Sequence, residues 1–240
     1  MYTVGVALGV ALFLPLSLSR WFRQFFYVRL YTAIQSVIEE SLLPVRAEVM
    51  AYLDDMTSHD ADLRSTGLLR VLEIGAGWGA NFCFVKRNIE YWNVDPNKEF
   101  NHCFRRQLCK YPKVQMKGHV CGCAEDMKEL PDEHFDVVIM TFVLCSAGNG
   151  AKVLEEIKRV LVKGGRLLFA EHVAHPRGSP ARWLQNFSTF VSSPVSCGCR
   201  QNRETWLLYE RAGFSKLEMK EANLDIPYAF NRICYGIAEV

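Results

Sequence analysis

RVLEIGAGWGAN, residues 70–81, is a short and mostly apolar run that ends in a group of glycines. Such a run predicts a buried strand of a parallel sheet that leads into a turn. Glycines in that turn allow the backbone to approach a ligand closely, and a helix after them would present free N–H groups. Many nucleotide-binding proteins share this loop, and a tight turn that binds no ligand is the alternative. A second signal is therefore needed.

That second signal lies at the end of the next predicted strand, residues 89–94. The strand ends in Asn93-Val94-Asp95-Pro96-Asn97, which places Asp95 twenty residues beyond Gly75. A carboxylate at this place can accept hydrogen bonds from both hydroxyls of a ribose. The alternative is that Asp95 only caps the following helix. The loop and Asp95 together indicate a cofactor that contains a nucleoside.

Strand and helix patterns alternate along the rest of the chain. Three more apolar runs predict strands at residues 114–120, 135–140 and 166–170, and the clearest helix between them covers residues 150–162. This alternation predicts an α/β fold with a parallel sheet. The tail differs: a helix over residues 203–212 precedes two further strands, 216–220 and 234–238, which resemble an antiparallel pair.

The composition excludes some classes of function. The chain has 240 residues and a net charge of +2, which is too weak to indicate a nucleic-acid partner. Its nine cysteines are scattered, and several lie in apolar runs, which indicates reduced thiols in a reducing compartment. The spacing Cys-x-Cys at residues 121–123 and 197–199 is not that of a zinc knuckle, so we predict no metal site.

The N-terminal segment is strongly apolar and carries no charge from Met1 to Ser19. A cleaved signal peptide would have a basic stretch before the apolar one, and none is present. Arg20, Trp21 and Arg23 follow at once, as the interfacial residues of a membrane anchor do. We therefore expect an anchor that spans the bilayer or lies in one leaflet, with its downstream flank in the cytosol.

Three regions follow from these patterns. Residues 1–28 are the anchor and its aromatic and basic flank. Residues 29–66 form a helix, kinked at Pro44, and then a polar linker from residue 57 to residue 66. Residues 67–240 form the globular domain.

The arrangement of these motifs resembles the class I S-adenosylmethionine-dependent methyltransferases. The resemblance also includes Cys121-Gly122-Cys123-Ala124-Glu125-Asp126-Met127 after the third strand. It implies a Rossmann-like, mostly parallel seven-stranded sheet with an antiparallel C-terminal strand. It implies that Asp95 binds the ribose, that residues 123–126 border the adenine, and that Thr141 and Phe142 line the methionine end. The implied cofactor-binding residues are Glu73, Gly75, Ala76, Gly77, Asn81, Asp95, Pro96, Asn97, Ala124, Glu125, Thr141 and Phe142. Ala80 stands where a dinucleotide-binding loop has its third glycine, which argues against a nicotinamide dehydrogenase.

A closer resemblance covers nearly the whole chain. The apolar N-terminus, the segments 73–82, 95–97, 143–146 and 171–173, and the sequence from Arg203 to Ser215 resemble the methyltransferase-like seven family. That family implies a monotopic protein of the endoplasmic reticulum membrane or lipid droplet, whose catalytic domain faces the cytosol. It also implies S-methylation of small, lipophilic alkyl thiols. The chain departs from the family at Ala76 and Trp78, where Cys and Thr are more frequent, and we expect the larger Trp78 side chain to alter the shape of the substrate pocket.

His172 is the candidate for guiding or deprotonating the acceptor, because it follows the fifth strand at the edge where open α/β sheets bind ligands. A structural, hydrogen-bonded histidine is the alternative, since a thiol is partly ionised at neutral pH and requires no strong base. Cys145 is expected to pack in the core.

Two other functions stay open at this point. One is an O- or C-methyltransferase of a lipid or quinone-like substrate, and the other is a non-catalytic membrane or droplet protein that uses the fold for binding. Residues 176–199 are expected to cover the substrate. The sequence indicates neither the acceptor nor an oligomeric state.

Overall fold

The computed structural model describes residues 19–193, 196–226 and 231–240. The apolar stretch predicted to be the membrane anchor, residues 1–18, lies outside the described residues. Within them, no helix combines the length and the apolarity needed to cross a bilayer.

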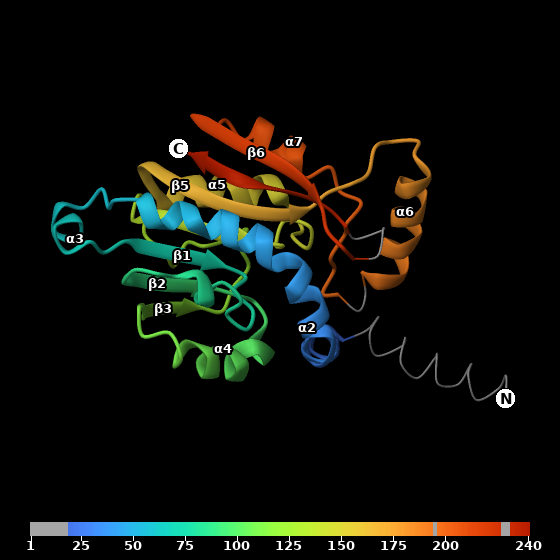
Figure 1. The fold of residues 1–240 in the computed structure, drawn as a ribbon, viewed down its shortest axis with the longest axis horizontal. Helices are drawn as coiled ribbons and strands as arrows, with labels where there is room; N and C mark the ends of the chain where they lie inside the picture. The colour runs from blue at the N-terminus through green and yellow to red at the C-terminus, as the bar shows by residue number, and fades with distance from the viewer. Residues whose placement is uncertain (1–18, 194–195, 227–230) are drawn as a thin grey trace.

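A single seven-stranded sheet organises the domain, in the order β3-β2-β1-β4-β5-β7-β6 (Figure 1). Only β7 runs antiparallel to its neighbours β5 and β6, which confirms the predicted mostly parallel, Rossmann-like sheet with an antiparallel C-terminal strand. The strands are β1 (Arg70–Ile74), β2 (Ile89–Val94), β3 (Val114–Val120), β4 (Phe135–Thr141), β5 (Leu161–His172), β6 (Lys216–Asn223) and β7 (Arg232–Glu239).

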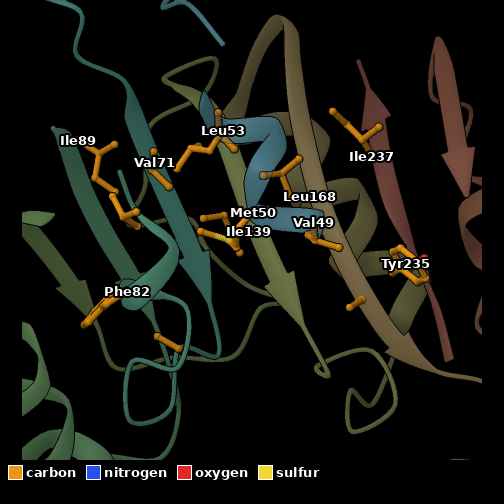
Figure 2. Close-up of a cluster of buried hydrophobic side chains, with 14 of the residues drawn as sticks. Val49, Met50, Leu53, Val71, Phe82, Ile89, Ile139, Leu168, Tyr235 and Ile237 are labelled. Atoms are coloured by element: carbon orange, nitrogen blue, oxygen red, sulfur yellow. The ribbon is translucent and has the colours of Figure 1, made fainter. Parts of the chain in front are cut away.

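Both faces of the sheet are covered, so its central strands are apolar on both sides. All seven residues of β4 are buried. On one face, Val49, Met50 and Leu53 pack over Val71 of β1 and over Ile139 of β4 (Figure 2). On the other face, the apolar stripe of α5 (Gly150–Val160) and Tyr209 of α7 (Trp206–Arg211) form a second cluster.

A long helix, α2 (Arg20–Ala51), covers the first face and continues into the 3-10 helix η1 (Tyr52–Asp55). It begins at Ser19, whose Oγ accepts the N–H of Phe22 at 3.2 Å. The helix includes Pro44 and runs without a break through the boundary predicted between residues 28 and 29.

The structure corrects several expected elements. The predicted linker contains a helix, α3 (Ala61–Thr66), because Asp60 caps its first turn and Gly67 ends it in the left-handed conformation. No α-helix follows the glycine loop directly; the chain forms the 3-10 helix η2 (Phe82–Phe84), since the Phe82 ring inserts into the core against Tyr91. Residues 121–134 form turns and bends.

The remaining helices follow the prediction more closely. Helix α5 ends at Val160 because the chain passes directly into β5, which begins five residues before the predicted strand. The predicted helix over residues 203–212 is the shorter α7. The others are η3 (Lys98–Phe100), α4 (Asn101–Leu108) and α6 (Pro180–Ser192).

The buried carboxylate of Asp136 ties the N-terminal segment to the sheet. Its Oδ1 accepts the Ser58 hydroxyl at 3.0 Å and the His59 N–H at 2.8 Å, and its Oδ2 accepts the Arg70 N–H at 2.9 Å. The carboxylate therefore joins the start of β4 to the start of β1 and to the chain that returns from α2.

We predict that Asp136→Ala lowers the free energy of unfolding by about 2–4 kcal/mol, because the buried Ser58 hydroxyl and two partly buried N–H groups lose their acceptor. Asp136→Asn, which keeps one acceptor oxygen, should lose less. Asp132→Ala is the matched control: this carboxylate is 73% exposed, and its ion pair with Arg159 should contribute less than about 1 kcal/mol. Urea unfolding measures all three variants. Equal losses for Asp136→Ala and Asp132→Ala would contradict this account.

Candidate active site

The glycine loop lies at the carboxyl end of β1, in close contact with the loop that follows β4. Gly75 has a φ of +68°, and a Cβ atom there would lie 2.6 Å from Cγ2 of Val143. The N–H of Gly75 donates to the carbonyl of Val94 at 2.8 Å. A side chain at residue 75 would therefore be both strained and too close to the neighbouring loop.

Asp95 connects this loop to the end of β2. Its Oδ2 accepts the N–H of Gly77 at 3.0 Å, and its Oδ1 accepts the N–H of Asn97 at 2.8 Å. Burial raises the pKa of the Asp95 carboxyl, while the two N–H groups oppose this change. The helix-capping role falls instead to Asn97, whose side-chain oxygen accepts the N–H of Glu99 at 3.1 Å. The Asp95 oxygens thus keep acceptor capacity for ligand hydroxyls.

Two buried amide atoms beside Asp95 have no hydrogen-bond partner among the described residues: Oδ1 of Asn93 and Nδ2 of Asn97. Buried polar groups in native proteins are nearly always paired, so an unpaired donor and acceptor beside one carboxylate indicate a polar ligand. A nucleoside, which carries hydroxyls and ring nitrogens, fits this set of atoms.

A buried polar network lies behind the glycine loop. Glu73 accepts hydrogen bonds from Tyr91 Oη and, at 2.7 Å, from Asn81 Nδ2. Burial raises the pKa of the Glu73 carboxyl, and these two hydrogen bonds oppose the increase. Arg46 of α2 donates to Asn81 Oδ1 at 2.8 Å and to Thr141 Oγ1 at 3.1 Å. The structure thus brings together three predicted site residues, Glu73, Asn81 and Thr141.

Sequence reasoning missed Arg46. It lies on a helix far from every motif, and no local pattern distinguishes it from a solvated arginine. In the structure the residue is buried, and its guanidinium lies 5.5 Å from the centroid of the Phe142 ring. The Arg46 Nε atom is 3.4 Å from Glu39 Oε2. This Nε atom makes no hydrogen bond to a described residue. This cation therefore has donor capacity left at the methionine end predicted for the cofactor.

The chain leaves β4 in an unusual conformation. Phe142 has a φ of +61°, which is uncommon for a bulky residue and typically occurs where the surroundings enforce it, as at functional sites. Its N–H donates to the carbonyl of Ala170 at 2.7 Å, and its ring lies 4.8 Å from the His172 ring, centroid to centroid. The strained residue thus faces the candidate catalytic histidine.

Glu171, at the end of β5, holds the loop that follows Phe142. Its Oε1 accepts the N–H groups of Val143 and Leu144, both at 2.8 Å, and its Oε2 accepts the N–H of Cys145 at 3.3 Å. Burial raises the pKa of this carboxyl to about 7, although the three N–H groups favour its charged form. The sequence placed Glu171 beside His172 but gave no signal of this role.

His172 and two cysteines form a compact group at the same edge. The Sγ atoms of Cys145 and Cys199 are 3.3 Å apart, and Cys199 Sγ lies 3.7 Å from His172 Nδ1. Cys145 is fully buried, as predicted, but its thiol also faces this group. The carbonyl of His172 accepts the Thr205 hydroxyl at 2.8 Å, which fixes the backbone here.

The residues predicted to border the adenine lie after β3. Ala124 packs in the second core cluster, and Oε1 of Glu125 accepts the N–H groups of Gly148 and Asn149, at 2.8 and 3.3 Å. Pro96 accepts a hydrogen bond from Gln24 of α2 at 3.2 Å. The adenine contact of Ala124 and Glu125 stays a prediction.

Comparison with known proteins agrees with this geometry. Residues 72–169 match the family described as methyltransferase domain. The chain is 38% identical to the mouse thiol S-methyltransferase TMT1B over 69% of its length and 68% of that protein. It is 31% identical to the human thiol S-methyltransferase TMT1A over 91% of its length and 86% of that protein.

Two solved structures share the fold. One is a putative methyltransferase from Bacillus halodurans, with a TM-score of 0.56 and 19% identity, covering 75% of this chain and 97% of that one. The other is a possible histamine N-methyltransferase from Thermotoga maritima, with a TM-score of 0.58 and 17% identity, covering 90% and 99%.

The fold, the residues at the carboxyl edge of its sheet and these similarities agree on one cofactor, S-adenosylmethionine. The chain belongs to the class I S-adenosylmethionine-dependent methyltransferases, in the family of the thiol S-methyltransferases.

Proposed function

We propose that this enzyme transfers the methyl group of S-adenosylmethionine to the sulfur of a small lipophilic alkyl thiol. The observation that carries the proposal is the 31% identity to a thiol S-methyltransferase over 91% of the chain. The alternatives have less support. Both relatives described above, at 38% and 31% identity over more than two thirds of the chain, are named thiol S-methyltransferases, which favours neither an oxygen or carbon acceptor nor a non-catalytic binding protein.

The chemistry places modest demands on the protein. The cofactor, when bound, supplies an electrophilic methyl carbon, so the side chains have to bind, orient and exclude water. A thiol with a pKa of about 8.5 is only a few per cent ionised at neutral pH, and the thiolate is the nucleophile. A group that increases ionisation of the acceptor at the site would therefore raise the rate.

The residues divide this work. Asp95, with Asn93 and Asn97, binds the ribose end of the cofactor. Arg46 provides an unused donor for the carboxylate of the methionine end, beside Phe142. We assign His172 to the ionisation of the acceptor thiol, because it lies at the carboxyl edge of the sheet against the ring of Phe142.

For the cofactor, Asp95→Ala should weaken S-adenosylmethionine binding by roughly 1.5–3 kcal/mol, the scale of hydrogen bonds lost from a charged group. Titration calorimetry measures the affinity, and Asp62→Ala, at an exposed carboxylate of α3, is the matched control. Unfolding measurements on both variants separate lost binding from lost folding. Unchanged affinity in folded Asp95→Ala removes the ribose-binding role.

For the acceptor, the rate of thiol methylation should rise with pH as the thiolate fraction grows. His172→Ala should lose rate mainly at low pH, by roughly 100-fold near pH 6.5, and should recover as pH rises, because free thiolate then becomes abundant. His102→Ala, at an exposed histidine of α4, should keep the original profile. An equal loss at every pH would point to a positioning or folding role instead.

We also propose that the domain binds a membrane surface of the endoplasmic reticulum or of a lipid droplet. Helix α6 supports this, because its polarity is inverted. Its buried face contains Gln185 and Thr189, whereas its exposed face carries large apolar side chains: Trp183 (72% exposed), Phe187 (60%) and Phe190 (82%). An exposed patch of large aromatic residues is typical of a surface that contacts a partner or a membrane.

The position of α6 relates this surface to the site. Figure 1 shows α6 and the beginning of α2 at the end of the sheet where the parallel strands terminate. Thr189 donates to Gln201 Oε1 at 3.0 Å, and Gln201 Nε2 lies 3.5 Å from Cys199 Sγ. A lipid-bound α6 would therefore hold the acceptor site near the bilayer, where lipophilic thiols concentrate.

Replacement of Trp183, Phe187 and Phe190 by serine should lower binding of the full chain to phosphatidylcholine vesicles by at least about 10-fold, because the apolar area inserted into lipid is lost. Leu43→Ser, at an exposed apolar residue of α2, is the control. Deletion of residues 1–19 should also shift the protein toward the soluble fraction. If the triple variant binds vesicles as tightly as Leu43→Ser, α6 does not bind the membrane. If the mature protein begins after Ser19, the N-terminal anchor is refuted.

A further inference from the structure

Cys145, His172 and Cys199 converge from three separate parts of the chain. Cys145 lies in the loop after β4, His172 ends β5, and Cys199 lies between α6 and α7. Their ligand atoms, the two Sγ atoms and a ring nitrogen, all lie within 4.8 Å of one another. Cys145 is fully buried and Cys199 is 9% exposed. The proposed function uses His172 alone and leaves two adjacent buried thiols unexplained.

We propose that these three side chains bind a zinc-class divalent cation, whose fourth coordination position accepts the substrate thiol. The second half of this proposal rests on the proposed thiol methylation, and the first half does not. Two thiolates and one imidazole are a ligand set that zinc prefers. Catalytic zinc sites use three protein ligands and keep one position open, whereas structural sites use four.

The distances are close to those that a tetrahedral ion requires. With zinc–sulfur bonds of about 2.3 Å and zinc–nitrogen bonds of about 2.0 Å, the sulfurs would be about 3.8 Å apart and each sulfur about 3.5 Å from the nitrogen. The structure has 3.3 Å between the sulfurs and 3.7 Å from Cys199 Sγ to His172 Nδ1. The third distance, from Cys145 Sγ to the ring nitrogen, is within 4.8 Å. A bound ion would draw the three ligand atoms toward the tetrahedral spacing.

Contacts around the group orient its cysteine ligands. Gln201 Nε2 donates to Cys199 Sγ at 3.5 Å, and Glu171 fixes the backbone of Cys145 through its N–H. Arg203 donates to the carbonyl of Leu144 at 2.8 Å, which brings a positive charge to the loop that carries Cys145. Such outer contacts orient ligands and tune the ion. Two thiolates would neutralise the dication, and a bound substrate thiolate would leave one negative charge near Arg203.

The step is balanced without an oxidant or reductant. The acceptor thiol binds the ion through sulfur and releases its proton to water, because coordination to the cation deprotonates a thiol. A sulfur lone pair then forms the S–CH₃ bond while the methyl–sulfonium bond breaks, and its electrons go to the sulfur of S-adenosylhomocysteine. The product thioether is neutral, binds the ion more weakly and leaves. His172 would thus promote ionisation of the thiol as a ligand of the ion.

Metal binding itself is the first test. The full chain, purified in detergent with a phosphine reductant in place of thiols, is titrated with zinc and with cobalt(II). One ion should bind per chain, and cobalt should give the sulfur-to-metal charge-transfer absorption of thiolate ligation. Cys145→Ser and Cys199→Ser should each lose this absorption, and Gln201→Ala should weaken zinc binding by about 10-fold. Cys109→Ser, at an exposed thiol that ends α4, should bind as the unchanged protein does.

The outcomes separate this proposal from thiol methylation. Each variant is first shown to be folded by its S-adenosylmethionine affinity. Absence of metal binding in the folded chain, or binding that Cys109→Ser lowers as much as Cys145→Ser, overturns the site. Addition of an alkyl thiol should change the cobalt spectrum, and an unchanged spectrum overturns the open position. If the enzyme methylates thiols at the full rate after the metal is removed, the catalytic role of the metal is overturned and the proposed function stands. If the metal-loaded enzyme methylates no thiol, the proposed function is refuted and the metal site stands.

Discussion

The active edge of this enzyme depends on one buried carboxylate. Glu171 accepts the N–H groups of three consecutive residues after β4 and thereby fixes the loop that carries Val143 and Cys145. Val143 packs directly over Gly75, so the same loop sets the space above the glycine turn. Phe142 is the first residue of this loop and has a positive φ. The hydrogen bonds that fix the following residues help to maintain this uncommon conformation. Glu171 therefore fixes the loop that lies against the glycine turn and that carries Cys145 of the thiol group.

Two helices outside the sheet, α2 and α6, pack next to the candidate site. Helix α2 brings Arg46 to the buried network of Glu73, Asn81 and Thr141, so the N-terminal region packs against the residues proposed to bind the cofactor. Helix α6 holds its polar side chains inward against Gln201 and presents aromatic residues outward. One helix thus contributes to the cofactor end, and the other connects the acceptor end to an apolar exterior.

Most of the sheet was predictable because its strands are buried on both faces. Runs such as residues 135–140 are apolar except for Asp136. Their short length and β-branched residues favour a buried strand over a helix. The glycine turn was predictable because its positive φ values favour glycine, and the spacing placed Asp95 at the end of the next strand, where it accepts the N–H of Gly77. Helix α3 was missed because its signals, Asp60 and Gly67, lie in a polar segment with no buried residue.

The acceptor side was less predictable, for a physical reason. Arg46, Glu171 and Cys199 acquire their roles only when segments far apart in sequence meet at one edge, and no local pattern predicts those contacts. Cys145 was assigned to the core from its apolar neighbours, which its burial confirms, but its proximity to Cys199 is a tertiary contact across 54 residues. The inverted polarity of α6 could not be predicted, because the sequence does not show which face of the helix is covered by the rest of the domain.

The central claim is that the carboxyl edge of this sheet directs a methyl group to sulfur. The most direct measurement uses S-adenosylmethionine labelled in its methyl group, offered with alkyl thiols, phenols and membrane lipids in parallel, with every product identified by mass spectrometry. The account predicts label in the thioether of a lipophilic thiol and little in the other acceptors. Label found only on oxygen, nitrogen or carbon, or in no acceptor while the cofactor binds, would contradict it.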